Sequence, residues 1–467
     1  MTTTIAVEEQ ESASLAATGP DQRSWPRWAL LVTIVAGTTG YLALRTLAAA
    51  GAQLACAVVA IAGFASLIVL ESRRPTLSRG AIWCGSLVLL CIAVALPPQG
   101  SRDIWAYTMY GRMVAAHGAS PYRHTPAEFQ GDPWEARVAP AWRHSRSVYG
   151  PLFTAVSAGG MAAVGNSATG GRVFFQSLAG LAVLAGLLLV RRVRGDPVAL
   201  AFIGLNPVVL AIVNGGHNDL LVGLAVLAGV VLASRSSRPW LAGIALAAGA
   251  LIKIAALLPL AAVIGWLAWR RGGLGRRRAE PERGRGWRDA AGAAGAAGAC
   301  LVAAYLLAGG WGAVAPLQLA SSFESRASIW GPHLLGRVLG RPDWWALAAV
   351  VVAALVVIAG GLRDRSALLA AGGAAVVYLL AAPYVLPWYA GWAIPALALA
   401  WRSRLAVLAL LDSALLLLVY IDRPGLRPGW LHHGLQVMAG RVVPGFELVA
   451  VAALCAMSAR RAVRAVR

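Results

Sequence analysis

The stretch from residue 81 to residue 107, AIWCGSLVLLCIAVALPPQGSRDIWAY, joins an apolar run to a polar segment. The run over residues 81–97 has nearly the length that crosses a bilayer, about 20 residues. Pro97 and Pro98 end it, and the acid Asp103 follows with aromatic side chains after it. The stretch therefore predicts a membrane helix that ends at the water edge of the bilayer, with a carboxylate just beyond it.

The rest of the chain has the same apolar character. Hydrophobic residues make up 58% of the 467 residues and charged residues only 13%, whereas about a quarter of a soluble domain is charged. Apolar runs recur from Trp28 to Met457. We therefore expect an all-α polytopic membrane protein in which residues 25–467 form a single transmembrane domain.

The first 24 residues differ from this pattern. They are polar, with Glu8, Glu9 and Glu11, and they lack the basic start and apolar core of a signal peptide. This composition predicts a disordered tail over residues 1–24. The topology described below places that tail in the cytoplasm.

The formal net charge of +21 does not indicate nucleic-acid binding. Lys253 is the single lysine, so arginines supply the other basic residues, and many of them end apolar runs as the positive-inside rule expects. No basic stripe with interleaved aromatic residues stands apart from the membrane segments. The five cysteines lie in apolar runs and show neither a disulfide framework nor metal-ligand spacing.

The arginine clusters set the expected topology, because cytoplasmic loops carry an excess of basic residues. Placing the clusters inside gives a bundle of about 13–14 transmembrane helices with both chain ends in the cytoplasm. The most basic loop, residues 271–289, is then cytoplasmic. The expected helices are residues 28–45, 51–71, 81–98, 172–190, 198–213, 220–233, 240–253, 256–270, 290–308, 344–361, 366–382, 388–401, 404–421 and 443–459.

Three loops then face outward: residues 99–171, the main extracytoplasmic loop, and residues 309–343 and 422–441. Residues 150–165 lie inside the first loop and could themselves cross the membrane, which would reverse every later loop. They are short and rich in glycine and alanine. We interpret them as a helix that lies at or dips into the outer interface.

Asp103 opens a predicted amphipathic helix that ends at Gly118. Ser101 is a possible N-cap, and an acid at a helix N-terminus suits the helix dipole. Two roles are therefore open for Asp103. It can be part of the helix cap and nothing more, or it can be a base at the membrane surface. Other polar residues predicted on the same outer face favour the second interpretation.

The segment Asn214-Gly-Gly-His217-Asn218-Asp219 joins two apolar runs on the outer side. Its residues are good turn formers, so it can be an ordinary hairpin. Histidine, asparagine and aspartate between helices at the bilayer edge are, however, costly unless they contact something polar. A sugar or a phosphate would be such a partner.

Lys253 lies at the outer end of a short apolar span, before Pro259. A lysine at the centre of a membrane helix costs about 2.5–3.5 kcal/mol. Its side chain can extend to the interface, or its compact charge can contact a lipid phosphate. Asp412, inside another apolar run, is expected to pair within the helix bundle.

Two aromatic segments are predicted at the outer edge. They are Tyr149-Gly-Pro151 and residues 383–392, PYVLPWYAGW, with Tyr384 and Trp388. Each can belong to an ordinary aromatic belt at the membrane surface or to a binding site.

In this order the residues resemble a known family. An Asp opens the first long outer loop. It is followed by a Gly-Arg helix that ends in Ser-Pro-Tyr, and then by Tyr-Gly-Pro-Leu. Later in the chain come three more features. They are Asn-Pro-Val followed by Gly-His-Asn-Asp, a helix with Ile-Lys, and Pro-Tyr followed by Pro-Trp-Tyr. From about residue 80 onward the chain resembles the actinobacterial polyprenol-phosphate-mannose-dependent α-1,6-mannosyltransferases, of the GT-C superfamily of polytopic glycosyltransferases.

The resemblance implies an inverting transfer of mannose from polyprenyl-phosphate-mannose to a lipid-linked or cell-wall glycan. The reaction would take place on the outer face of the plasma membrane and form α-1,6 linkages. It implies Asp103 as the catalytic base. The substrate-binding residues would come from Arg102, Tyr107, Arg112, His217, Asn218, Asp219, Lys253, His333, Tyr384 and Trp388.

The implied partners are the lipid bilayer, the lipid-linked donor and the glycan acceptor. Many members of the superfamily carry paired acids in the first outer loop, but Arg102 and Ile104 flank Asp103 here. We therefore assign no metal ligands, and the need for a divalent metal is left open, as is the oligomeric state.

Two alternatives stay open. A transporter or flippase of lipid-linked saccharides would also have many spans, with internal repeats and polar sites near the midplane. No repeat across the two halves is visible, and the polar residues are predicted at one face. The other alternative is a GT-C enzyme that uses another sugar, such as arabinose.

Overall fold

The computed structural model describes residues 25–44, 46–272, 280–317, 366–382, 384–422 and 425–466, with isolated positions between 334 and 340. Every regular element in this described part is helical. The fold is therefore that of an all-α polytopic membrane protein, as expected. The predicted tail over residues 1–24, the predicted helix 344–361 and the candidate His333 lie outside the described residues.

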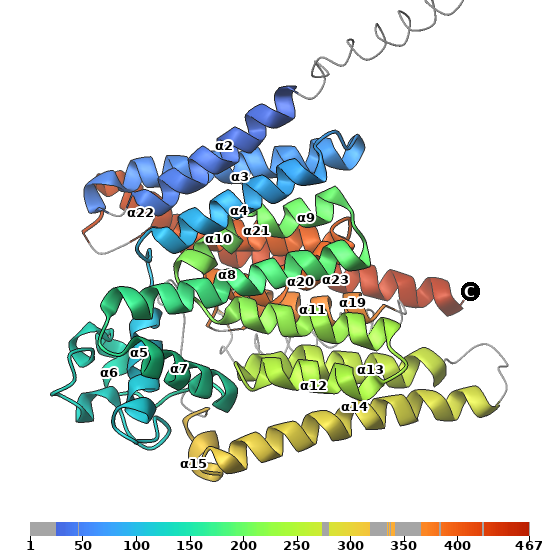
Figure 1. Ribbon diagram of the computed structural model, residues 1–467. Helices are drawn as coiled ribbons and strands as arrows, with labels where there is room; N and C mark the ends of the chain where they lie inside the picture. The colour runs from blue at the N-terminus through green and yellow to red at the C-terminus, as the bar shows by residue number, and fades with distance from the viewer. Residues whose placement is uncertain are drawn as a thin grey trace, which may run out of the picture.

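The long helices pack side by side and run in roughly the same direction across the molecule (Figure 1). Most are apolar all round, which suits burial between neighbours or against lipid. They are α2 (Trp25–Ala43), α3 (Ala50–Arg73), α4 (Arg79–Ala95), α8 (Ala168–Val193), α9 (Pro197–Gly204), α10 (Pro207–Asn214), α11 (Asp219–Arg235), α12 (Pro239–Ala250), α13 (Leu257–Gly272), α14 (Glu280–Leu307), α19 (Ala367–Ala381), α21 (Arg404–Val419) and α23 (Val443–Val466).

Shorter elements complete the described part. They are α5 (Asp103–Ala115), α6 (Pro140–Arg143), α7 (Pro151–Val164), α15 (Trp311–Val314), α20 (Ile394–Leu397), α22 (Gly429–Val437) and short 3-10 or π turns such as η5 (Pro387–Trp392). Among the described residues, four segments are long and apolar enough to cross a bilayer alone, and the bent pair α9–α10 makes a fifth if it counts as one span. The expected number of about 13–14 crossings stays a prediction.

The predicted helix 198–213 is broken into α9 and α10, which meet at an angle of 41°. The break lies at Asn206-Pro207. Proline has no N–H to continue a helix and suits a first helical position. The Asn206 side chain accepts the Val208 N–H at 3.0 Å and so caps the new helix.

The prediction of a single helix over residues 388–401 is also wrong. The chain there forms the 3-10 turn η5, the short helix α20 and a second 3-10 turn. Pro387 and Pro395 each lack a donor for an α-helical hydrogen bond. The irregular backbone brings the aromatic side chains of η5 into the interior, where Trp388, Tyr389 and Trp392 are buried.

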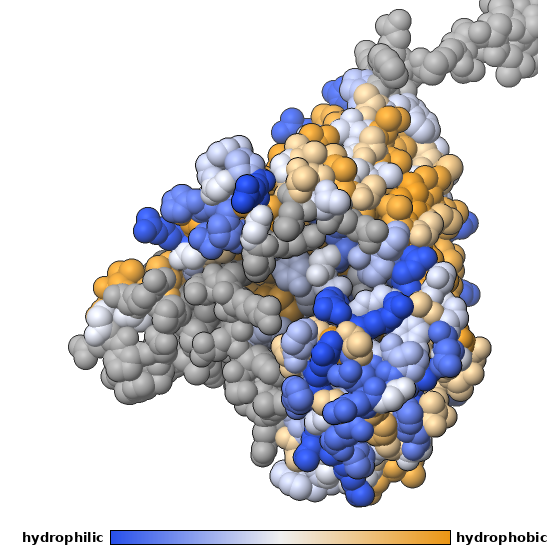
Figure 2. Space-filling model, turned by 90° about the vertical axis from the view of Figure 1, so that its left-hand side faces the viewer, coloured by the Kyte–Doolittle hydropathy of each residue, from blue (hydrophilic) through white to orange (hydrophobic). Residues whose placement is uncertain are grey.

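The two ends of the bundle differ. The connections α3–α4, α8–α9 and α11–α12 carry arginine clusters and lie at one end, while α5, α6 and α7 lie at the other (Figure 1). Figure 2 looks onto the second end and shows hydrophilic side chains gathered over part of it, next to hydrophobic flanks. The separation agrees with the sidedness that the arginine pattern predicts.

The segment that carries Asp103 departs from its prediction in one respect. Helix α5 ends at Ala115, close to Gly118 with its φ of 60°. It is buried on nearly all sides instead of being amphipathic, because α7 packs directly on it. A Cβ on Gly111 would come within 2.6 Å of the Ser157 carbonyl oxygen, so only glycine allows this approach. Helix α7 lies beside α5 at the end of the bundle and also contacts α8 and α14 (Figure 1).

Asp412 lies within α21 and is only 1% exposed. Both of its carboxylate oxygens are without a hydrogen-bond partner in the described part of the chain. Within the described part of the chain, the expected pairing of Asp412 inside the bundle is therefore wrong. The buried face of α21 consists mainly of alanine and leucine, and Ser413 bonds to the carbonyl of Leu410 in its own helix.

Candidate active site

Asp103 is the first residue of α5, at the polar end of the molecule. Its own N–H donates to Ser101 Oγ at 3.0 Å, although the N-cap residue is Arg102 and not the predicted Ser101. The Asp103 side chain is 14% exposed. Burial raises its pKa to about 6, although Lys253 and Ser101 act to lower it. A carboxylate with this pKa suits a general base near neutral pH.

The turn between α10 and α11 brings His217 against Asp103. The distance from His217 Nδ1 to Asp103 Oδ2 is 3.6 Å. The imidazole stacks on the indole of Trp388, with ring centroids 4.0 Å apart and planes 13° apart. Burial lowers the pKa of His217 well below its usual value, so the ring is neutral near pH 7. Three predicted site residues from distant parts of the chain thus meet.

Asp219 and Lys253 form an ion pair next to this contact. Lys253 Nζ lies 2.8 Å from Asp219 Oδ1, and Trp392 Nε1 donates to the same oxygen at 2.6 Å. The ammonium also lies over the ring of Tyr389, 4.1 Å from its centroid. Both charges act on the pKa of Asp103, which places the pair within electrostatic range of the base.

Several polar atoms of the turn lack partners in the described part of the chain. Asn218 is 2% exposed, and neither its Nδ2 nor its Oδ1 makes a hydrogen bond. The second oxygen of Asp219, Oδ2, is also buried without a partner. Buried polar groups are nearly always hydrogen-bonded. These atoms therefore provide unused hydrogen-bonding capacity beside Asp103, suited to the hydroxyl groups of a sugar.

A backbone contact that the sequence did not reveal positions Lys253. The N–H of Gly150 donates to the carbonyl of Ile252 at 3.0 Å, and the N–H of Leu152 donates to Leu251 at 3.1 Å. A Cβ on Gly150 would come within 2.1 Å of the Leu251 carbonyl oxygen. The Tyr149-Gly-Pro segment, predicted only as aromatic residues at the edge, therefore anchors the loop that ends at Lys253.

A second pair of glycines places Asp219. A Cβ on Gly223 in α11 would come within 1.9 Å of the Gly391 carbonyl oxygen, and a Cβ on Gly391 within 3.3 Å of the Asp219 Cβ. The two glycines let α11 and η5 approach closely enough for Trp392 to reach Asp219. Tyr389 and Trp392 are thus site residues that we did not predict, although they lie in the aromatic segment that the sequence singled out.

Not every predicted site residue joins this cluster. Arg112, at the other end of α5, donates to both oxygens of Asp132 at 3.0–3.1 Å and to Asn166 at 2.6 Å. Arg102 donates to the carbonyl of Arg137 at 2.7 Å. The structure places Arg112 in a structural ion pair, and a contact of Arg112 with substrate therefore has no support from its position.

Two tyrosines take intermediate positions. Tyr107 is buried edge-to-face against Tyr149 and Phe153, with both centroid distances at 4.9 Å, so it supports the wall behind Asp103. Tyr384 contacts Tyr389 with ring centroids 6.2 Å apart, at the edge of the cluster. His333 lies outside the described residues.

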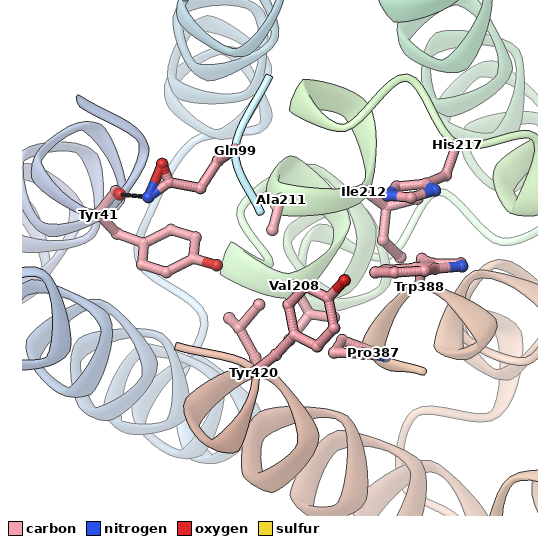
Figure 3. Close-up of a pocket in the computed structure, with 10 residues that line it drawn as sticks. Tyr41, Gln99, Val208, Ala211, Ile212, His217, Pro387, Trp388 and Tyr420 are labelled. Carbon is pink, nitrogen blue, oxygen red and sulfur yellow. Dashed lines mark hydrogen bonds between the residues drawn. The ribbon is translucent and has the colours of Figure 1, made fainter. Parts of the chain in front are cut away.

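A pocket lies beside the His217–Trp388 stack (Figure 3). Apolar side chains of α10 and α21 form its walls, and Tyr41, Gln99 and Tyr420 add polar groups. The ring of Tyr420 packs edge-on against Trp388, with centroids 5.1 Å apart. The site thus has a polar side, with Asp103, and a more apolar side within the bundle.

The described residues contain no group of three histidine, cysteine, aspartate or glutamate side chains that could hold a metal ion. The side chains of the cluster offer proton transfer and electrostatic stabilisation. Asp103 can accept a proton, Lys253 can stabilise negative charge, and the turn can bind hydroxyl groups.

Helices that gather a base, a lysine and aromatic rings at one polar end fit a polytopic membrane glycosyltransferase. The family model for "Alpha-(1->6)-mannopyranosyltransferase, N-terminal domain" matches residues 11–270, more than half of the chain. The chain belongs to this family, which confirms the resemblance seen in the sequence.

Individual relatives agree with the family. The chain is 35% identical over 179 residues to α-(1→6)-mannopyranosyltransferase A of Corynebacterium glutamicum, covering 36% of this chain and 35% of the relative. It is 30% identical over 212 residues to a probable α-(1→6)-mannopyranosyltransferase of Mycolicibacterium smegmatis, covering 38% of each. The α-(1→6)-mannopyranosyltransferase B of C. glutamicum is 31% identical over 148 residues, covering 30% of this chain and 24% of the relative.

The similarity therefore spans well under two thirds of the length of each of these relatives. No solved structure matches the chain.

Proposed function

We propose that the protein transfers mannose from polyprenyl-phosphate-mannose to a lipid-linked or cell-wall glycan on the outer face of the plasma membrane, forming an α-1,6 linkage. The observation that carries the proposal is the 3.6 Å contact of Asp103 with His217, in the same turn that leads to the Asp219–Lys253 ion pair. Membership of the mannopyranosyltransferase family supports the sugar and the linkage.

The proposed reaction is a single displacement at C1 of mannose. The acceptor hydroxyl forms the new C1–O bond while the bond from C1 to the phosphate oxygen breaks, and the configuration at C1 inverts. Asp103 takes the proton of the attacking hydroxyl, and polyprenyl phosphate leaves with the electron pair of the broken bond. A positioned general base typically contributes 10²–10⁴-fold to such a step.

Lys253 is proposed to stabilise the leaving phosphate. An ammonium has three donors, and one of them reaches Asp219. The side chain is 15% exposed, and we propose that its remaining donors reach the phosphate. As negative charge develops on the leaving oxygen, a charge-assisted hydrogen bond to it strengthens.

The His217–Asp219 turn is proposed to bind the mannose. The amide of Asn218 can donate to and accept from sugar hydroxyl groups, and Oδ2 of Asp219 can accept from them; none of these atoms has a partner among the described residues. The stacked His217 and Trp388 rings form a flat apolar wall beside them. Arg102 flanks Asp103 on the more exposed side and remains a candidate for contact with the acceptor or the phosphate.

The test is mannosyl transfer by the purified full chain in lipid nanodiscs. Synthetic polyprenyl-phosphate with radiolabelled mannose is the donor, and a synthetic α-(1→6)-linked dimannoside is the acceptor. We expect a trimannoside whose new bond is cleaved by an α-1,6-specific mannosidase, with no energy source added.

Glu128→Gln is the matched control, because Glu128 is an exposed acid of the same outer segment. We expect it to retain activity while Asp103→Asn loses it. Movement of the lipid-linked sugar across a vesicle membrane without glycosidic bond formation would contradict the proposal and favour a flippase. Transfer from a polyprenyl-phosphate-arabinose donor alone would correct the sugar.

A further inference from the structure

Three helices end close together beneath the candidate active site. The C-terminal ends of α2 and α4 and of the short helix α10 are joined there by buried side chains. The last carbonyl groups of a helix have no partner within it. In a membrane protein they must find one from another part of the chain.

Asn214, the last residue of α10, supplies much of this pairing. It is fully buried, and its Nδ2 donates to the carbonyls of Ala93, Leu96 and Pro97 at 3.0–3.2 Å. Its Oδ1 accepts the N–H of Gln99 at 2.9 Å. Both the nitrogen and the oxygen of the amide are therefore hydrogen-bonded, and the amide connects α10 to the segment that follows α4.

Gln176 of α8 reinforces the same junction. It is fully buried, and its Nε2 donates to the carbonyl of Asn214 at 2.6 Å and to that of Leu96 at 3.0 Å. Arg172, one turn earlier on α8, donates to Gln176 Oε1 at 2.9 Å and to the carbonyl of Leu96 at 3.0 Å. The network thus anchors the ends of α4 and α10 to one long helix.

The segment after α4 is fixed from its other side as well. The Gln99 side chain donates to the carbonyls of Tyr41 and Leu44 at 3.0 and 2.9 Å, at the end of α2. Figure 3 shows the first of these bonds at the edge of the pocket. Gln99 is therefore held by Asn214 through its backbone and by α2 through its side chain.

In the sequence, residues of this network come shortly before Asp103 and shortly before the His217–Asp219 turn. Asp103 follows Gln99 by four positions, and His217 follows Asn214 by three. The hydrogen bond between Gln99 and Asn214 is therefore a short connection between the base and the turn that faces it. The two elements meet in the 3.6 Å contact between Asp103 and His217.

We propose that Asn214 and Gln176 are positioning residues of the mannosyl transfer. They hold the Asp103 carboxylate at a fixed place relative to the His217–Asp219 turn, through Gln99 and without contact to substrate. This inference rests on the proposed function. A small displacement of a reacting group, about 1 Å, can lower a rate by about 10²-fold.

The experiment compares Asn214→Ala with Asn206→Ala. Asn206 is a matched control because it is equally buried and caps the opposite end of the same short helix. Both changes should lower the unfolding temperature. We expect only Asn214→Ala to lower kcat, by at least about 10-fold with KM little changed, since it displaces the base and not the bound sugar.

A double-mutant cycle separates positioning from general damage. In an Asp103→Asn background the base is already gone, so adding Asn214→Ala should lower kcat by less than about 3-fold, and the two effects should not add. In the parent, the rate should fall on the acid side with a midpoint near pH 6. In Asn214→Ala this midpoint should shift, because the surroundings of Asp103 change. A purely structural role would give additive effects and an unchanged pH profile.

If Asn214→Ala does not fold, Gln176→Leu provides the same comparison, since it removes the bonds to the Asn214 and Leu96 carbonyls and leaves the Asn214 side chain in place. Unchanged kcat and pH profile in the folded variant would overturn the positioning role while the proposed function stands. If the unmodified protein transfers no mannose, or Asp103→Asn transfers it normally, the proposed function fails, and the positioning role fails with it.

Discussion

The two ends of helix α5 hold buried polar groups in different states. At the C-terminal end, Arg112 binds both oxygens of Asp132, and His117 binds one of them at 2.8 Å. At the N-terminal end, Asp103 has the 3.6 Å contact with His217, and the neighbouring Asn218 amide is without a partner among the described residues. One end of the helix is electrostatically complete, and the other is not.

The difference separates a structural site from a site that a ligand completes. A paired charge has little capacity left for another molecule, and removing one partner costs stability. Buried polar groups without partners cost stability in the folded protein and gather where a ligand satisfies them. Changes at the Arg112 end should therefore act on stability, and changes at the Asp103 end should act on activity.

The largest effect is expected at the structural end. Arg112→Met leaves the buried carboxylate of Asp132 without its main partner, which costs about 3–5 kcal/mol of folding free energy. Hydrogen bonds from Arg112 and His117 also outweigh burial and lower the pKa of Asp132, in agreement with a stabilising pair. Denaturant or thermal unfolding in detergent measures the loss. A stable Arg112→Met variant with no transfer activity would restore the sequence-based prediction that Arg112 binds substrate.

Asp103→Asn should act in the opposite manner. The amide keeps the size of the side chain but cannot accept the acceptor's proton, so transfer should fall by about 10² or more, near 3 kcal/mol of barrier. The unfolding temperature should stay the same or rise, because a buried charge is removed. Turnover within a few-fold of the parent would place the base elsewhere and leave Asp103 with a role in the helix end only.

Lys253 combines both kinds of role, because it pairs with Asp219 and is also the proposed contact of the leaving phosphate. Lys253→Met alone leaves the buried carboxylate of Asp219 with the Trp392 hydrogen bond but without a counter-charge, so it should destabilise the fold. In Lys253→Met/Asp219→Asn stability should recover, while donor affinity stays lower by about 1.5–3 kcal/mol, the scale of a hydrogen bond to a charged group. Binding of fluorescent polyprenyl phosphate measures this, and an unchanged affinity would limit Lys253 to the ion pair.

The pH dependence gives a smaller and more gradual effect. Burial raises the pKa of Asp103 to about 6, and the base works only when it is deprotonated. Below pH 6 the rate should therefore fall about tenfold per unit, and above it the rate should level off. The neutral His217 adds no step near pH 7. Glu128→Gln should show the same profile as the parent, and a rate that is flat from pH 5 to pH 8 would contradict the assignment.

Much of the fold could be predicted from run lengths alone, because a membrane helix needs an apolar run of defined length. The same sidedness argument brought Asp103, His217, Asp219 and Lys253 to one end, and the structure joins them. The breaks were not predicted. A short apolar run with an internal proline can continue or bend, and packing decides between the two.

The sequence could not reveal contacts whose partners are backbone atoms of distant helices. Asn214 was noticed only as part of a turn, although its amide binds three carbonyls at the end of α4. The role of Gln176 could not be predicted, because one polar residue in an apolar helix has many possible partners. The pairing of Arg112 with Asp132 was not predicted, because Asp132 lies in an irregular segment that no periodicity places.

The unpaired acid in α21 has a consequence for how the chain enters the membrane. An aspartate at the centre of a helix costs about 2.5–3.5 kcal/mol during insertion by the translocon, and each leucine returns about 0.3–0.6 kcal/mol. Residues 404–419 contain eight leucines around Asp412. Their summed contribution is about the same size as the cost, so α21 is a helix of nearly neutral insertion energy.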